Sequence, residues 1–195
     1  MKKIIKIIFI TLLLNSCAPK NLGTFGRGVS ITFDPRTVGM QIDDTIMQKN
    51  LIARLTLLDK KYFLSIQVEV LDGRIFVTGK VEAPEEKIKI TKYAWETRGV
   101  RSVSNAIEIK GKSNFKSTAK DILITTQLRT ALIFNKTIKS SNYTLETINK
   151  KIYIFGISLT EEEKKLVIQE ANEIYDVEKI IPTIYLVSEL SRNKI

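Results

Sequence analysis

The chain has 195 residues, enough for two small domains, and its 44% hydrophobic and 27% charged content is ordinary for a globular protein. Its formal net charge of +10 favours anionic partners. It contains one cysteine and no histidine, so no disulfide can form within it and histidine-based catalysis is excluded.

Residues 1 to 16 have the features of an export signal. A basic start is followed by a short apolar run, Ile4 to Leu14, and by small residues before Cys17. The run is about half the roughly 20 residues that a membrane-spanning helix needs, so a permanent span is not expected. The segment resembles a bacterial lipoprotein signal, which implies cleavage before Cys17 and its acylation, palmitate included. The alternative is an ordinary secretory leader with a chance cysteine.

Ala18 follows the cysteine, and the same resemblance then implies attachment to the outer membrane on its periplasmic face. Without the three lysines of the leader, 28 basic residues remain against 21 acidic ones, a net charge of +7. Residues 17 to 42 hold four of the nine glycines and two of the four prolines, which is typical of a flexible tether. Those glycines lack the preceding strand and following helix of a phosphate-binding loop, so that site is excluded.

Two modules are predicted after the tether, at residues 43–110 and 118–188. In the first, apolar residues at helical spacing predict a helix over 43–58, with Asp43 or Asp44 capping its start. Side chains of adjacent helical residues do not converge, so these two acids are not a catalytic pair. Strands are predicted at 66–70, 75–81 and 103–109, and a helix at 85–98.

The second module repeats the first at a constant offset along the chain, which superimposes Gly79 on Gly156 and Asp44 on Asp121 without gaps. It predicts helices at 118–134 and 161–175 and strands at 143–147, 152–157 and 180–187. Pro182 cannot donate to a strand ladder, so the last strand is expected to start late or to lie at an edge. Residues 111–117 are a predicted linker and 189–195 a loose tail.

Gly79 and Gly156 each stand near the end of an otherwise apolar predicted strand. A glycine in that position indicates that a neighbouring element approaches too closely for a side chain. We expect a helix lying on the sheet, and a structural rather than a binding role for both glycines.

Both modules, in the order α-β-β-α-β, resemble BON domains. The segment Asp34 to Asp44, DPRTVGMQIDD, also resembles the one that precedes the first module in dual-BON outer-membrane lipoproteins of the DolP family. So do residues 23–26, GTFG, and Thr125-Thr126 with Arg129. The resemblance covers nearly the whole chain after the leader. It implies an α+β fold in which each module is a two-layer sandwich of two helices on a small three-stranded mixed sheet.

The same resemblance implies a non-enzymatic periplasmic protein without a cofactor, which binds anionic phospholipid and helps to keep the envelope intact. It places lipid contact on the first helix of the second module, near an exposed tryptophan that aligns with Leu123 here. Polar Thr45 in the first copy corresponds to Ile122, so the second helix has additional apolar surface, suited with nearby cations to a membrane interface. The candidate lipid-binding residues are Lys120, Ile122, Leu123, Thr126 and Arg129.

Several alternatives stay open. Ile122 and Leu123 could simply widen the core stripe or pack on the first module. Trp95 is expected to seal an interface between the modules rather than to contact a membrane. A structural adaptor that binds envelope proteins or peptidoglycan is the alternative function.

Catalysis and metal binding find no support in the residue pattern. Only carboxylates, lysines and hydroxyls are available, no metal-ligand spacing occurs, and the acidic run 161–163 is best interpreted as a helix start. No catalytic or metal-binding residue is therefore assigned. Nucleic acid is not an expected partner, because an exported chain would rarely meet it and no aromatic-basic platform occurs.

Overall fold

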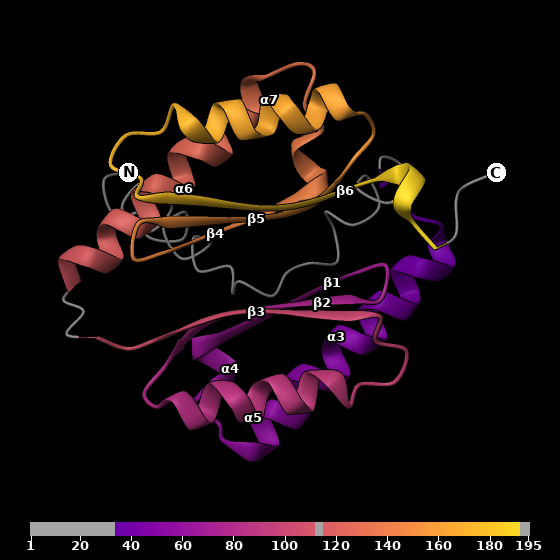
Figure 1. The fold of residues 1–195 in the computed structure, drawn as a ribbon, viewed down its shortest axis with the longest axis vertical. Coiled ribbons are helices and arrows are strands. Elements are labelled where there is room, and N and C mark those ends of the chain that lie inside the picture. Colours follow the sequence, from indigo (N-terminus) through magenta and orange to yellow (C-terminus); the bar gives the residue numbers. More distant parts are fainter. Residues whose placement is uncertain (1–33, 112–114, 192–195) are drawn as a thin grey trace, which may run out of the picture. The chain divides into compact units, whose positions relative to one another are not determined.

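The computed structural model of the chain describes residues 34–111 and 115–191, which belong to one compact unit beginning at Asp34 (Figure 1). The predicted leader, Cys17 and most of the tether lie outside the described residues. Among the described residues, none of the helices combines the length and the apolar character required to cross a membrane.

The first copy forms a three-stranded sheet with its helices on one face (Figure 1). In the sheet order β1-β2-β3, β1 is antiparallel and β3 parallel to the central strand. The predicted mixed sheet with two covering helices is confirmed, and the short helix α4 was not predicted. The elements are α3 (Val38–Leu58), α4 (Tyr62–Ser65), β1 (Ile66–Leu71), β2 (Arg74–Val81), α5 (Pro84–Trp95) and β3 (Ser102–Ile109).

The second copy repeats this arrangement in the order β4-β5-β6, with the same antiparallel and parallel pairings. Because β6 is an edge strand, Pro182 lies at an edge as predicted. The elements are α6 (Phe115–Phe134), the 3-10 turn η2 (Ser140–Asn142), β4 (Tyr143–Ile148), β5 (Lys151–Ser158), α7 (Glu161–Asn172), β6 (Lys179–Leu186) and the 3-10 turn η3 (Val187–Glu189).

Each copy has its own core between helices and sheet. Met47, Leu51 and Leu55 recur at every fourth position on α3, so they form one stripe that is buried against the sheet. The stripe on α6 occupies the equivalent positions of the second copy and consists of Ile124, Leu128 and Leu132.

The opposite faces of the two sheets pack on each other. Phe76 on β2 and Phe155 on β5 meet with ring centroids 4.3 Å apart, and Ile148 and Tyr153 complete this buried cluster. Trp95, by contrast, is half exposed at the end of α5 and belongs to none of the described clusters between the copies. Its predicted role in the interface is wrong, because the apolar contact comes from the sheets.

Asp44 and Asp121 hold turns and do not cap helices. The helix α3 begins at Val38, with Thr37 as its cap, so Asp44 lies inside it and is buried. Its carboxylate accepts the backbone N–H groups of Asp72 and Gly73 in the β1–β2 turn, both at 2.8 Å. The prediction of a capping role is therefore wrong.

The second copy repeats this contact. Asp121 accepts the N–H groups of Asn149 and Lys150 in the β4–β5 turn, both at 2.9 Å. Each copy thus uses one buried carboxylate of its first helix to fix its hairpin turn.

The two glycines do permit close approaches, though not by a helix lying across the sheet. A Cβ on Gly79 would lie 2.1 Å from the carbonyl oxygen of Ser65, and one on Gly156 would lie 2.4 Å from Cδ1 of Tyr143. Ser65 ends the short helix α4 immediately before β1, and Tyr143 is the first residue of β4. The expected helix on the sheet is wrong, because the approach occurs along the antiparallel pair and within the sheet.

Leu190 and Ser191 are docked on the first copy, within the segment for which a loose tail was predicted. Leu190 is buried with Met40 and Ile157, and the backbone N–H of Ser191 donates to the Asp72 carboxylate at 3.1 Å. Residues 192–195 of the predicted tail lie outside the described residues.

Candidate functional site

The outer surface of α6 carries four large apolar side chains in solvent. Ile122 is 62% exposed, Leu123 56%, Ile133 62% and Phe134 80%. With Thr126 and Arg129, which are also exposed, they form a continuous surface that we call the α6 face. It consists of Ile122, Leu123, Thr126, Arg129, Ile133 and Phe134.

Helix geometry explains why these residues lie outside the core. Successive residues of a helix are rotated by roughly 100°, so the core stripe of α6 occupies one side and Ile122 and Ile133 point away from it. Ile122 and Leu123 therefore do not widen the core stripe. Ile46, the equivalent of Leu123 in the first copy, is likewise exposed.

The threonines of α6 add little polarity to this surface. The Thr126 hydroxyl donates to the carbonyl oxygen of Ile122 at 2.8 Å, and the Thr130 hydroxyl donates to that of Thr126 at 2.8 Å. A hydroxyl proton bound to the helix backbone is not available to an outside acceptor. Thr126 can therefore accept a hydrogen bond from a ligand, but its proton is already used.

Arg129 supplies the charge of the α6 face. It is exposed, and within residues 34–111 and 115–191 no ion pair is formed by its guanidinium. The acidic residue of α6, Asp121, is buried and bonded to the β4–β5 turn. Among its described side chains, α6 thus offers positive charge to solvent and no negative charge.

Lys120 lies one turn before Leu123, at the border of the α6 face, because residues three apart on a helix are neighbours. Its Nζ is engaged there in an ion pair with Asp176 Oδ2 at 2.9 Å. Nζ of Lys150 donates to the other oxygen of Asp176, Oδ1, at 2.5 Å. The hydrogen bonds from Lys150 and Lys120 lower the pKa of Asp176, so this carboxylate stays ionised and keeps both lysines engaged. Four of the five candidate residues thus share one exposed surface, and the charge of the fifth, Lys120, is paired with Asp176 beside it.

Ile133 and Phe134 were missed by the sequence interpretation. They lie about three turns after Ile122 and Leu123, and the same 11-residue spacing joins each pair. That spacing was the available signal, since residues 11 apart share one side of a helix.

A separate groove of about 550 Å³ lies in the first copy. Its lining comes from α3, the β1–β2 turn, the loop between α5 and β3, and Ser191, and it includes no residue of α6. The described residues also contain no cluster of three or more metal-ligating side chains. The groove and the α6 face are therefore distinct features.

Residues 43–111 and 120–185 both match the family model of the BON domain. The chain belongs to the BON-domain family. The two copies are BON domain 1 and BON domain 2, in chain order, and the α6 face lies on the first helix of BON domain 2.

Three proteins are similar in sequence to this BON protein. The Haemophilus influenzae outer membrane lipoprotein DolP is 24% identical over 93% of this chain and 94% of its own. An uncharacterized protein from the gshII 5' region of Anaplasma centrale is 31% identical over 64% of this chain and 83% of its own. A 21 kDa hemolysin of Actinobacillus pleuropneumoniae is 23% identical over 77% of this chain and 78% of its own.

Among solved structures, CdsD, a structural protein of the type III secretion system of Chlamydia trachomatis, matches with 15% identity and a TM-score of 0.29. The match covers 73% of this chain. The chain in turn spans 63% of that CdsD structure.

Proposed function

We propose that this BON protein is a non-enzymatic periplasmic lipoprotein, anchored to the outer membrane through Cys17, whose α6 face binds anionic phospholipid and so helps to maintain the membrane. The exposed, apolar and singly cationic surface of α6 is the observation that supports this proposal. The similarity to an outer membrane lipoprotein over 93% of the chain supports the location.

The α6 face has the dimensions of a helix that lies flat in a membrane interface. Ile122 and Ile133 are 11 residues apart, which corresponds to about 16 Å along the helix axis. Burying a large apolar side chain contributes roughly 1.5–3 kcal/mol, and about half of that is available here because each side chain is partly covered already. A cation near an anionic surface contributes about 1 kcal/mol, which is the role of Arg129.

These contributions predict that α6 alone binds a membrane weakly. An acyl anchor at Cys17 would make this weak contact sufficient. An acylated cysteine keeps the domain close to the leaflet, so a weak contact operates at high effective concentration. In this mechanism the acyl chains provide residence at the membrane, and the α6 face provides recognition of its charge.

Flotation of residues 18–195 with vesicles tests this proposal without the acyl chains. We expect recovery with phosphatidylglycerol vesicles at low salt, and less recovery at high salt or with neutral vesicles, because part of the attraction is electrostatic. Equal recovery from charged and neutral vesicles would contradict recognition of the anionic headgroup.

Substitutions identify the surface that is responsible. The double variant Ile122→Ser with Ile133→Ser should lose most of the flotation, and Arg129→Gln should lose its salt dependence. Ile88→Ser is the matched control, because Ile88 is an exposed isoleucine on α5. If the α6 variants float as the control does, the α6 face is not the contact. A protein or peptidoglycan partner that is retained by the Ile122 variant would then favour the structural adaptor.

A further inference from the structure

The first helix of BON domain 1 has an exposed apolar surface of its own. Val38, Ile42 and Ile46 are each more than half exposed and recur at every fourth position on α3. Lys49 follows within one turn and is also exposed. We call Val38, Ile42, Ile46 and Lys49 the α3 face. Its apolar side chains and its cation resemble those of the α6 face, although α3 also exposes Asp43 beside Ile42.

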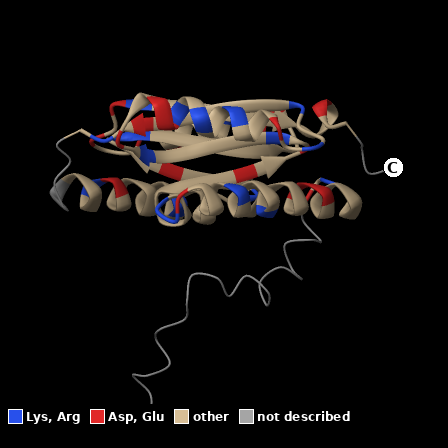
Figure 2. Ribbon diagram, turned by 90° about the horizontal axis from the view of Figure 1, so that it is seen from below, with Lys and Arg blue, Asp and Glu red and all other residues tan. Residues whose placement is uncertain are grey.

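The two first helices lie on the same side of the sheets. Figure 1 shows α3 and α6 on the far side, partly behind α5 and α7, and Figure 2 shows a helix layer running along one side of the strands. The contacts agree, because α3 packs on β1 and α6 on β4, the equivalent edge strands of the two sheets. One flat surface can therefore contact both helices.

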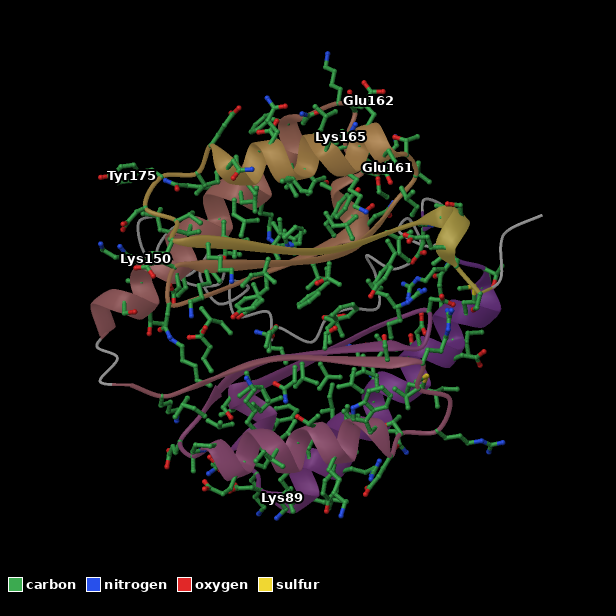
Figure 3. All side chains as sticks on the ribbon, in the orientation of Figure 1. Lys89, Lys150, Glu161, Glu162, Lys165 and Tyr175 are labelled. Carbon is green, nitrogen blue, oxygen red and sulfur yellow. The ribbon has the colours of Figure 1, made fainter. Side chains whose placement is uncertain are left out.

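The other two helices have a different character. The outer surface of α7 carries Glu161, Glu162 and Lys165, which point away from the sheet (Figure 3). That of α5 exposes Ile88 and Trp95, but also Glu85 beside Lys89 and Lys92. Exposed acids on α5 and α7 are repelled by an anionic leaflet, so the side that contains α6, whose acidic residue is buried, is the better membrane-contacting side.

The course of the chain indicates what covers the α3 face. The described part begins at Asp34, just before α3, so the tether from Cys17 joins the domain at the Val38 end of this face. Asp34 stands 17 residues after Cys17, so the chain between them can span at most about 60 Å. An anchored Cys17 therefore keeps the start of α3 within that distance of the leaflet.

We propose that the α3 face inserts into the same phospholipid leaflet as the α6 face, so that both BON domains contact the membrane and its plane fixes their orientation. This inference rests on the proposed function of the α6 face. Two linked contacts reinforce each other, because insertion of one helix places the other at high local concentration. The sheet-to-sheet contact around Phe76 and Phe155 holds the two helices in one layer and makes simultaneous insertion possible.

Single-tryptophan probes test each helix separately. Trp95, which is the only tryptophan in the chain, is replaced with phenylalanine, and tryptophan is then introduced in place of Ile42, Ile122 or Ile88 in residues 18–195. All three positions are exposed, so the substitutions should leave the fold intact, as thermal unfolding by circular dichroism verifies. The probe ligand is a phosphatidylglycerol vesicle whose acyl chains carry bromine, which quenches tryptophan fluorescence at close range.

The expected result is quenching of the Ile42→Trp and Ile122→Trp probes and no quenching of the Ile88→Trp control. Quenching at position 122 alone would overturn the inference and leave the α6 contact intact. Quenching at neither position would contradict both proposals. If Ile42→Trp emits at short wavelength before vesicles are added and is not quenched by them, the tether or another protein covers the α3 face and the inference fails.

A binding measurement gives the second test. The double variant Ile42→Ser with Ile46→Ser should lower the vesicle partition coefficient about tenfold, since two half-exposed isoleucines lose their insertion. Ile88→Ser should leave the coefficient unchanged. An unchanged coefficient for the α3 double variant would also overturn the inference.

Discussion

Replacing Asp121 with alanine is predicted to destabilise BON domain 2 by roughly 3–6 kcal/mol. Its buried carboxylate accepts two backbone N–H groups of the β4–β5 turn, from Asn149 and Lys150, both at 2.9 Å. Both of these residues have left-handed backbone conformations, with φ of 50° and 60°. A hydrogen bond to a charged acceptor contributes about 1.5–3 kcal/mol, and alanine removes two of them together.

Urea denaturation of residues 18–195, followed by far-UV circular dichroism, measures this loss. Asp121→Asn retains one acceptor oxygen and should cost about half as much as Asp121→Ala. The control is Gln127→Ala on the exposed side of the same helix, which should change the free energy of unfolding by less than about 0.5 kcal/mol. If Asp121→Ala and Gln127→Ala lie within about 1 kcal/mol of each other, the carboxylate does not hold the turn.

Two further predictions concern the interface between the copies and the strand contact at Gly156. Burial acts to raise the pKa of Glu108, but hydrogen bonds from Lys151 and Asn149 outweigh it, so the pKa is lowered. The contribution of Glu108 to stability is therefore complete above about pH 5 and is lost as the pH falls, so the unfolding free energies of the wild type and Glu108→Gln should converge as the pH is lowered below that range. If the two unfolding free energies converged as the pH rises instead, the pKa of Glu108 would be raised on folding, which would contradict the prediction. Gly156→Ala would place a Cβ 2.4 Å from Tyr143 and should cost about 2 kcal/mol or more in thermal or urea unfolding, whereas Gly111→Ala, which meets nothing within 4 Å, should be neutral. Equal effects of the two alanines would contradict the close approach.

The duplication made the fold predictable from sequence. A constant offset without gaps means that every local signal occurs twice, and a helix or strand supported in both copies is rarely accidental. The predicted strand over 75–81 and the observed β2 (Arg74–Val81) differ by a single residue. Helix ends were predicted less accurately. The apolar spacing placed the start of the first helix at residue 43, whereas α3 begins at Val38 with Thr37 as its cap.

The role of Asp44 could not be obtained from local spacing. Its bonding partners, the N–H groups of Asp72 and Gly73, are 28 and 29 residues away. A capping role is the favoured local explanation for an acid near a helix start. The superposition of Asp44 on Asp121 indicated that Asp44 is not a cap. Asp121 has three predicted helical residues before it and cannot be an N-cap, so its equivalent in the first copy should not be one either.

The contact between the copies also left a signal in the sequence. Phe76 alternates with the core residues Ile75 and Val77, so β2 has large apolar side chains on both of its faces. Helices cover one face of such a sheet, and a second apolar face requires a second partner. The prediction that Trp95 lies in the interface was wrong, because one large aromatic side chain indicates a buried face less reliably than the alternation along a strand does.

Burial of both sheet faces determines which surfaces remain for a membrane. Each sheet contacts its own helices on one face and the other sheet on the opposite face, so the outer sides of the helices are the large surfaces left in solvent. Of the two first helices, α3 exposes Asp43 beside Ile42, whereas the acidic residue of α6 is buried. An exposed acid is repelled by an anionic leaflet, which weakens the α3 contact relative to the α6 contact. The duplicated helices therefore have unequal parts in the proposed mechanism: α6 recognises the charged leaflet, and α3 supplies apolar contact once α6 is bound.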